Sequence, residues 1–401
     1  MEKLKEFIKN QPLIFIICIL CLISCFAILN AAPLIRNIPS PYTLWLKQFI
    51  FYIISFVVIY IINKVGNDQV YDKIWIVYGI LMVLLLGLVI DRFFYTKITI
   101  GKDIIPFANT TNGATSWYNL PGFSLQPSEF MKIVIVIILA NVTKEYNDYV
   151  LVPTFESELR YIGKCMAVVL PPALLVYLQN DTGVVLIIMM GVFFVILSSG
   201  LRGQWFTVGF IIVGCILALG AYLFIYQPQI FSKIISGHKL DRFYGWLDPE
   251  GTVGKQGFQL FYSLLSYGTA SWLGHGFQAV VKVFPEAQTD FIFAVILTDY
   301  GFVGGLITVT TIVALDITLL KIGFDSTNHR DKFFTMGIFG MIFFQQVWNM
   351  GMILGLLPIT GITLPFLSYG GSSLLSYMIA IGMFLDIHNQ NNLVKNRKKI
   401  Y

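Results

Sequence analysis

The sequence predicts an all-α polytopic membrane protein, with ten transmembrane helices and a large extracellular loop between spans 7 and 8. Hydrophobic residues make up 56% of the chain and charged residues only 12%, whereas a soluble domain carries roughly 25% charged residues. Apolar runs long enough to cross a bilayer recur along the whole chain. These runs lack the alternation of barrel strands, which excludes an outer-membrane β-barrel.

The chain is expected to form one membrane domain over residues 1–401, within which 227–290 is the large extracellular loop. The basic opening residues lead into the first span without a small-residue cleavage site, so this span is expected to be retained. Pro171-Pro172 predicts a kink in the fifth span. The expected spans are 13–31, 44–62, 74–91, 128–142, 164–178, 183–199, 204–226, 291–321, 333–357 and 371–389.

The distribution of Lys and Arg predicts which side of the membrane each segment faces. With the N-terminus inside, the inner segments hold sixteen of these cations and the short outer loops hold five. This positive-inside bias places both termini in the cytoplasm and explains the net charge of +5 without a nucleic-acid partner. The polar outer segments 92–127, 227–290 and 358–372 are then expected to roof any site.

Asp290 stands where the large loop enters the eighth span, in the stretch PEAQTDF. A carboxylate at the mouth of an apolar helix is costly and therefore indicates a function, although a helix-capping acid is the alternative. Asp299 follows nine residues later, on the opposite helix face and roughly 13 Å deeper. These two acids therefore do not predict a two-carboxylate hydrolase.

Three more charged residues lie at the outer ends of spans. Glu129 and Lys132 share one face of the fourth span, which Ser128 is expected to cap. The pair either neutralises itself or presents a cation to a cavity. Asp181, in the tight turn before the sixth span, either caps that helix or adds a carboxylate to the site.

The large loop carries an aromatic stretch, RFYGWLDP, that suits the lipid headgroup layer. Within it, the planar guanidinium of Arg242 matches phosphate oxygens. Gln345 and Asn349 share a face of the ninth span and are expected to hydrogen-bond a neighbour or line a cavity. The sequence contains no P-loop, zinc-protease or G-x-S-x-G motif.

Seven stretches together resemble the SEDS family (shape, elongation, division and sporulation), typified by RodA and FtsW. They occur in the family's order and cover nearly the whole chain: NGxxxW, FSLQPSEFMK, QNDTGVV, RFYGWLDP, GFQ, PEAQTDFIFAVI and NMGMILGLLPITGITLPFLSYGGSSLL. The resemblance implies a ten-span fold in a cell membrane, with the catalytic face outside. It also implies peptidoglycan glycosyltransferase activity, in which lipid II is polymerised through β-1,4 links and undecaprenyl pyrophosphate is released.

Carried onto this chain, the family's essential acid falls on Asp290, which is therefore expected to be the catalytic base. The substrate-binding residues implied by the same motifs are Glu129, Lys132, Asp181, Arg242, Gln259 and Ser372. No resident metal is implied, although a divalent Mg²⁺ or Mn²⁺ ion could accompany the pyrophosphate. The implied protein partner is a class B penicillin-binding protein, a transpeptidase.

The chain departs from the family pattern at three places. Gln288 replaces the usual histidine before Thr-Asp, and Thr298-Asp299 replaces a Glu-Glu pair. Thr115-Ser116 replaces a basic pair, which shifts the expected phosphate contacts to Arg242 and Lys132. Two other functions suit ten polar-lined spans, namely a lipid II flippase or other lipid transporter and a non-catalytic scaffold for a transpeptidase. The short cytoplasmic tails favour the RodA-like branch.

Overall fold

The computed structural model describes residues 11–36, 38–98, 102–111, 114–150, 152–234, 237–254 and 257–400. The basic opening residues 1–10 and Asn112-Gly113 of the NGxxxW motif lie outside the described residues. Each of the ten expected spans corresponds to a helix: α2 (Pro12–Ala31), α3 (Leu44–Val65), α4 (Asn67–Lys97), α5 (Pro127–Tyr149), α6 (Phe155–Leu178), α7 (Thr182–Ser198), α8 (Gly203–Tyr226), α12 (Ile292–Phe324), α13 (His329–Ile353) and α14 (Gly371–Ile400).

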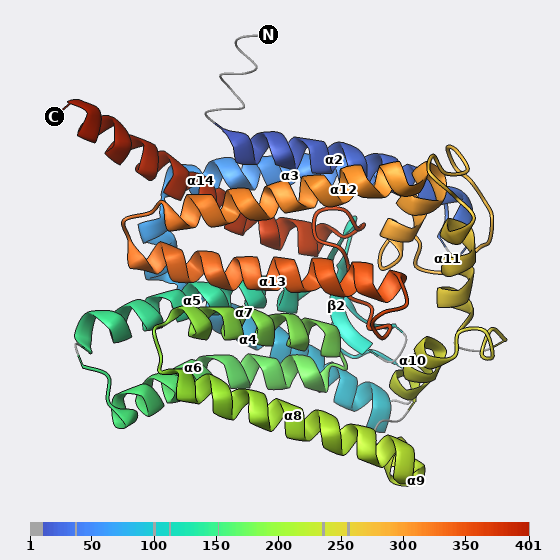
Figure 1. Cartoon of the computed structure of the whole chain (residues 1–401), viewed down its shortest axis with the longest axis horizontal. Coiled ribbons are helices and arrows are strands. Elements are labelled where there is room, and N and C mark those ends of the chain that lie inside the picture. The colour runs from blue at the N-terminus through green and yellow to red at the C-terminus, as the bar shows by residue number, and fades with distance from the viewer. Residues whose placement is uncertain are drawn as a thin grey trace.

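The long helices run side by side as a bundle, with β2, α10 and α11 at the end opposite the C-terminus (Figure 1). We call this end the cap end. Within the described residues, seven helices are both long and apolar enough to cross a membrane, and α7 is a shorter apolar helix. The chain is therefore a multi-pass membrane protein, while ten crossings stay a prediction.

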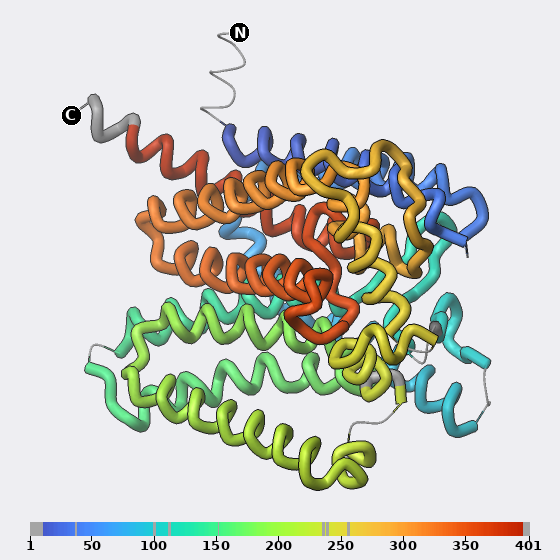
Figure 2. Tube along the Cα trace, turned by 45° about the vertical axis from the view of Figure 1, so that its right-hand side comes forward, coloured from blue at the N-terminus to red at the C-terminus, as the bar shows by residue number. Residues whose placement is uncertain are grey.

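Helix α5 forms the centre of the bundle, because every residue from Met131 to Ala140 is buried. Such all-round burial matches the continuously apolar sequence from Ile133 to Ala140. Helix α8 is the opposite case, since none of its residues is buried. It lies at the edge of the bundle in two views (Figures 1 and 2), and its apolar surface is what a lipid-facing helix presents.

The helical fold is as predicted, and a small antiparallel sheet at the cap end is added to it. It has the order β1-β2-β3, with β1 (Ala108–Thr111), β2 (Ala114–Leu120) and β3 (Phe123–Leu125). Tyr118 pairs with Ala108 on one side and with Leu125 on the other, and its hydroxyl donates to the Leu84 carbonyl of α4 at 2.9 Å. The Asn-Gly pair between β1 and β2 is a strong hairpin signal.

The described residues of the large loop form three helices, α9 (Pro228–Ile234), α10 (His238–Leu247) and α11 (Phe258–Gly268), followed by turns. Trp246 of α10 fastens the loop to the bundle, since its indole N–H donates to the Gly355 carbonyl at 2.9 Å. Phe243 packs on Trp246, with ring centroids 5.8 Å apart. The aromatic stretch thus packs against the protein at the cap end.

Helix α12 is not the continuous span expected over 291–321, because Gly301 has the non-helical angles φ 59°, ψ −154°. The turn before it fills the break: Phe302 N–H donates to the Ser271 carbonyl at 3.1 Å, and His275 N–H donates to the Thr298 carbonyl at 2.9 Å. Glycine is required at 274, where a β-carbon would lie 2.2 Å from the Asp299 carbonyl oxygen. This backbone pairing satisfies the groups that the break frees.

Candidate active site

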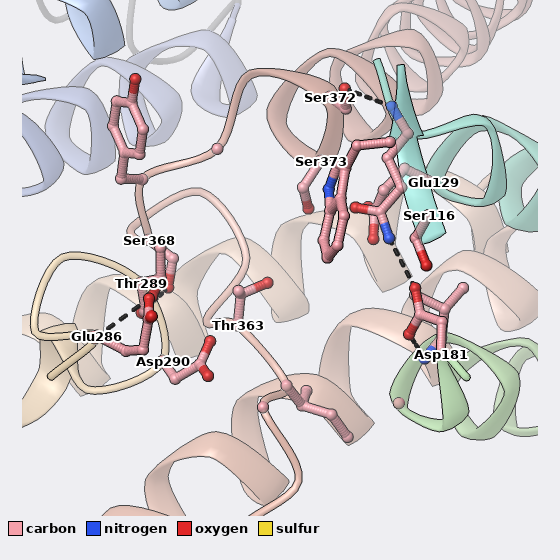
Figure 3. A pocket seen from close by; sticks show the side chains of 18 of the residues that line it. Ser116, Glu129, Asp181, Glu286, Thr289, Asp290, Thr363, Ser368, Ser372 and Ser373 are labelled. Atoms are coloured by element: carbon pink, nitrogen blue, oxygen red, sulfur yellow. Dashed lines mark hydrogen bonds between the residues drawn. The ribbon is translucent and has the colours of Figure 1, made fainter. Parts of the chain in front are cut away.

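A cavity of about 1030 Å³ opens at the cap end of the bundle. All three polar segments expected to roof a site contribute to its wall, through Gln126, Arg242, Asp290, Gly361 and Ser372 among others. The roof prediction is therefore confirmed. Figure 3 shows two groups of acids in this cavity, with Asp290 and Glu286 on one side and Asp181 and Glu129 on the other.

Asp290 lies in the turn that precedes α12, and the backbone around it is firmly held. Its carbonyl accepts a hydrogen bond from the Asn349 side-chain amide at 2.8 Å, and Ser368 Oγ donates to the carbonyl of Thr289 at 2.7 Å. Glu286, four residues earlier, has a left-handed φ of 56°, a costly conformation that often occurs at functional sites.

The carboxylate of Asp290 makes no hydrogen bond or ion pair with any described side chain or backbone group. It is only partly exposed and lines the cavity. Burial raises the pKa of Asp290 to about 7, and the charge of Glu286 adds to this rise while Arg242 opposes it. A carboxylate with a pKa near 7 is suited to taking up a proton at neutral pH.

Arg242 of α10 reaches the same part of the cavity. A β-carbon on Gly361 would stand 3.2 Å from Arg242 Nη1 and 3.3 Å from Asp290 Oδ2. Gly361 has φ +76°, which a side chain would strain, so this glycine leaves the space between the cation and the acid open. Within the described residues, the guanidinium has no hydrogen-bond or ion-pair partner and remains available to a ligand.

Glu129 and Lys132 form a buried ion pair, with 2.6 Å between Lys132 Nζ and Glu129 Oε2. Glu129 lines the cavity, whereas Lys132 is fully buried behind it and lies 4.1 Å from the centroid of the Tyr377 ring. The pair is thus self-neutralised in this structure. The expected Ser128 cap is wrong, because α5 begins at Pro127 and its N-cap is Gln126.

Asp181 both caps α7 and lines the cavity, so the two alternatives given for this residue do not exclude each other. Its Oδ1 accepts from the Val184 N–H at 3.3 Å, as an N-cap does. Its Oδ2 accepts from Gln126 Nε2 at 2.7 Å. Burial is the main cause that raises the pKa of Asp181 to about 6.

Gln259 and Ser372 line the cavity while holding its wall together. Gln259 Nε2 donates to the Pro285 carbonyl at 3.1 Å. Ser372 Oγ accepts from Gln126 N–H at 3.0 Å and donates to the Ser124 carbonyl at 2.6 Å. Their direct contact with a substrate stays a prediction.

The shared face of Gln345 and Asn349 is confirmed as a hydrogen-bonding face. Asn349 Nδ2 donates to the Ile362 carbonyl at 2.7 Å, in addition to its bond with Asp290. Gln345 Nε2 donates to the Thr363 carbonyl at 3.4 Å and its Oε1 accepts from the Tyr377 hydroxyl. Two side chains of α13 therefore fix the loop that carries Gly361.

Sequence reasoning missed Gly361, Gln126 and Glu286 as parts of the site. Gly361 had a signal, since a glycine between two prolines of an apolar re-entry indicates a close backbone approach. Among the described residues, no group of three or more His, Cys, Asp or Glu side chains is arranged to hold a metal ion. The described part of the chain therefore contains no metal-binding site built from three or more such side chains.

Comparison with known sequences gives one family. The family model described as cell cycle protein (FtsW, RodA, SpoVE) matches residues 7–393. A probable peptidoglycan glycosyltransferase FtsW of Haemophilus influenzae is 35% identical over 303 residues, covering 73% of this chain and 72% of the relative. The stage V sporulation protein E of Bacillus subtilis is 33% identical over 279 residues, covering 69% and 72%.

Solved structures give the same fold. The rod shape determining protein RodA of Thermus thermophilus aligns with a TM-score of 0.64 at 21% identity, covering 95% of this chain and 97% of that one. A chain from a peptidoglycan synthase complex, described as coordinating polymerization and crosslinking, aligns with a TM-score of 0.72 at 22% identity, covering 95% and 98%.

Proposed function

This chain belongs to the cell cycle protein family of FtsW, RodA and SpoVE and is a glycosyltransferase, and we propose that it polymerises lipid II into peptidoglycan glycan strands. The new linkages are β-1,4 bonds, and each step releases undecaprenyl pyrophosphate. The observation that carries this proposal is the Asp290 carboxylate, which lines the cavity without a partner, beside an equally unpartnered Arg242.

Asp290 acts as the general base. An acceptor sugar hydroxyl attacks the anomeric carbon of the donor and passes its proton to the carboxylate. The oxygen–carbon bond forms as the bond from that carbon to the diphosphate oxygen breaks. Attack from the opposite face inverts the anomeric centre, and one carboxylate suffices because diphosphate leaves without protonation.

Arg242 stabilises the diphosphate as negative charge develops on it. Its guanidinium presents parallel N–H donors that match phosphate oxygens, and it stands beside the base across the space above Gly361. Lys132 has a smaller share in this proposal than expected, because Glu129 already neutralises it at 2.6 Å. It contacts phosphate only if the pair separates.

The cap end faces the cell exterior in this proposal, and both termini face the cytoplasm. Support comes from the positive-inside distribution of Lys and Arg. Lipid II is an amphiphile, so its polyprenyl tail stays among the apolar helix surfaces while its sugars enter the cavity at their cap end. Helix α8, which has no buried residues, lies at the edge of the bundle (Figure 1), where such a tail would meet it.

A divalent cation would enter as a companion of the diphosphate. Mg²⁺ is commonly held by one or two carboxylates together with substrate phosphates, and Asp290 and Glu286 lie on the same side of the cavity (Figure 3). It would supply further neutralisation of the leaving group. Polymerisation measured with EDTA and after re-addition of Mg²⁺ or Mn²⁺ tests this requirement.

The partner in this proposal is a class B penicillin-binding protein. The synthase complex whose chain shares this fold is described as joining polymerization to crosslinking. Co-purification with a transpeptidase from the same organism, and activity with and without it, test the pairing. The RodA-like role also stays a prediction: on depletion, loss of rod shape supports it, whereas filaments with blocked septa assign the chain to division.

The deciding experiment incubates purified protein with lipid II and separates the products on a gel. We expect polymer with the natural chain and none with Asp290→Asn. Undiminished polymer with Asp290→Asn defeats the base assignment. Transfer of lipid II across vesicles without polymer makes the chain a transporter, and a partner that polymerises only when this chain is present makes it a scaffold.

A further inference from the structure

The cavity has a second polar end that the proposed chemistry does not use. We call it the Asp181 end, and it consists of Ser116, Trp117, Gln126 and Asp181. Figure 3 shows Ser116 and Asp181 together, across the cavity from Asp290, with Thr363 between the two groups. The Asp290 end, by contrast, holds Arg242 and Gly361.

Among the described residues, nothing forms a hydrogen bond with the buried hydroxyl of Ser116. The residue is 0% exposed, it lines the cavity, and its Oγ has no hydrogen-bond partner in the structure. Leaving such a group unsatisfied costs about 1–3 kcal/mol, and natural proteins rarely accept this without a reason. A polar ligand in the cavity would supply the missing partner.

Trp117 follows Ser116 on β2 and is half-buried in the same wall. Its indole N–H makes no hydrogen bond within the described part of the chain. An aromatic face with a free polar edge suits a partner that is apolar on one side and polar at its rim. A pyranose ring has this character, with C–H groups on its faces and hydroxyls around its edge.

Gln126 and Asp181 add a fixed pair of planar polar groups. The 2.7 Å hydrogen bond from Gln126 Nε2 to Asp181 Oδ2 orients both side chains. Gln126 is also fixed by its backbone N–H, which donates to Ser372 Oγ, and Asp181 by the Val184 N–H, which donates to its Oδ1. Acceptor oxygens of a carboxylate and an amide match the hydroxyl and acetamido N–H donors of an amino sugar. The pair is preorganised, so a ligand need not order it.

From this arrangement we propose that the Asp181 end is a saccharide subsite that binds the acceptor sugar by stacking on Trp117. The proposal rests on the proposed function, because it takes Asp290 as the base and Arg242 as the diphosphate contact. In an inverting attack the acceptor and the leaving group stand on opposite faces of the anomeric carbon. The acceptor therefore belongs on the side of Asp290 away from Arg242.

One geometric and one electrostatic observation support this assignment. The successive residues Thr360 and Gly361 lie near different ends: Thr360 O and Asp181 Oδ1 lie 3.8 Å and 4.0 Å from the β-carbon position of Gly183, while the β-carbon position of Gly361 lies 3.2 Å from Arg242 and 3.3 Å from Asp290. The two ends are thus neighbours. The carboxylate of Asp181 also repels a diphosphate, whereas it accepts hydroxyl donors.

The test measures sugar binding separately from catalysis. The probe is the soluble disaccharide of N-acetylglucosamine and N-acetylmuramic acid, which has neither lipid nor diphosphate, added to Asp290→Asn protein in nanodiscs. Saturation-transfer NMR is expected to detect the sugar ring protons. When Trp117→Leu is combined with Asp290→Asn, we expect the affinity for the disaccharide, measured by titration, to fall at least tenfold. Trp117→Phe is expected to change it little, because phenylalanine keeps a face for stacking.

Ser116→Ala guards against misfolding as an explanation. It removes an unpartnered hydroxyl, so thermal stability is expected to hold or rise while disaccharide affinity falls about threefold to tenfold. Trp75→Leu, at an exposed tryptophan of α4 outside the cavity, is the matched control. Equal binding by Trp117→Leu and the parent overturns the subsite. Absence of polymer from the natural chain instead overturns the proposed function, and undiminished polymer from Asp290→Asn overturns only the base assignment, whatever the sugar does.

Discussion

The Asp290 carboxylate and the Arg242 guanidinium face the same point above the backbone of Gly361, at 3.3 Å and 3.2 Å from where a β-carbon would stand. The acid and the cation come from segments almost fifty residues apart, and a third segment separates them with a glycine that has no side chain. Their spacing therefore depends on this glycine having no side chain.

Replacing that glycine tests the spacing. Gly361→Ala inserts a methyl group between the two side chains and strains a φ of +76° by about 1–2 kcal/mol. We expect polymerisation to fall by roughly tenfold or more, since small misplacements of catalytic groups are expensive. The control is Gly355→Ala, which has φ +74° and nothing within 4 Å. Equal losses in both variants would attribute the effect to backbone strain alone.

The pH dependence of polymerisation is a second test. Asp290 must be ionised to accept a proton, and burial raises its pKa to about 7. The rate at low substrate concentration is therefore expected to rise through pH 7 and level off above it. Arg242→Gln removes a charge that lowers this pKa, so the midpoint moves up. Glu286→Gln removes a charge that raises it, so the midpoint moves down. Shifts in the same direction would contradict the assignment.

Stability should also vary with pH through Asp290. The folded chain keeps its proton up to about pH 7, whereas the unfolded chain releases it near the ordinary pKa of 3.8. Between these values the unfolded state binds fewer protons, so stability falls as pH rises. We expect Asp290→Asn to unfold at a higher temperature than the natural chain at pH 8, with the difference closing near pH 4. Asp72→Asn, which changes an exposed acid of α4, should follow the natural chain throughout.

The buried pair of Glu129 and Lys132 offers a double-mutant cycle. Removing one partner leaves a buried charge uncompensated, which typically costs about 3–5 kcal/mol. Glu129→Gln and Lys132→Met are each expected to lower thermal stability strongly, and the double variant is expected to recover much of the loss. Additive losses would show that the two charges do not stabilise each other. Inactivity of a stable double variant would indicate that the pair also meets the substrate.

The position of the helices could be predicted because apolar length is a local property of the chain. Glu129, Asp181 and Asp290 could also be predicted to lie on one side, since each begins or precedes a span there, and Arg242 lies in the large loop on the same side. Contacts between distant segments could not. The pairing of Lys132 with Glu129 was one of the two alternatives, because the residues are three apart on one helix, but nothing in the sequence around Lys132 predicts its contact with the Tyr377 ring.

The small sheet was not predicted, because the prediction rested on the long apolar runs that indicate helices. The pair Asn112-Gly113 was nevertheless a signal for a hairpin. The break at Gly301 was missed for a different reason. Its sequence is compatible with a continuous apolar helix. The broken conformation is stabilised by backbone hydrogen bonds from residues 271–276, which pack against it. Such tertiary pairing has no local signature.

The break at Gly301 divides α12 into two parts that can be oriented separately, which a continuous helix would not allow. Residues beyond it, with their outward apolar face, can lean to match a thinner or thicker membrane. The short piece next to Asp290 is anchored instead by α13 and by neighbouring backbone. A change in the tilt of the part beyond Gly301 would thus leave the position of Asp290 unchanged.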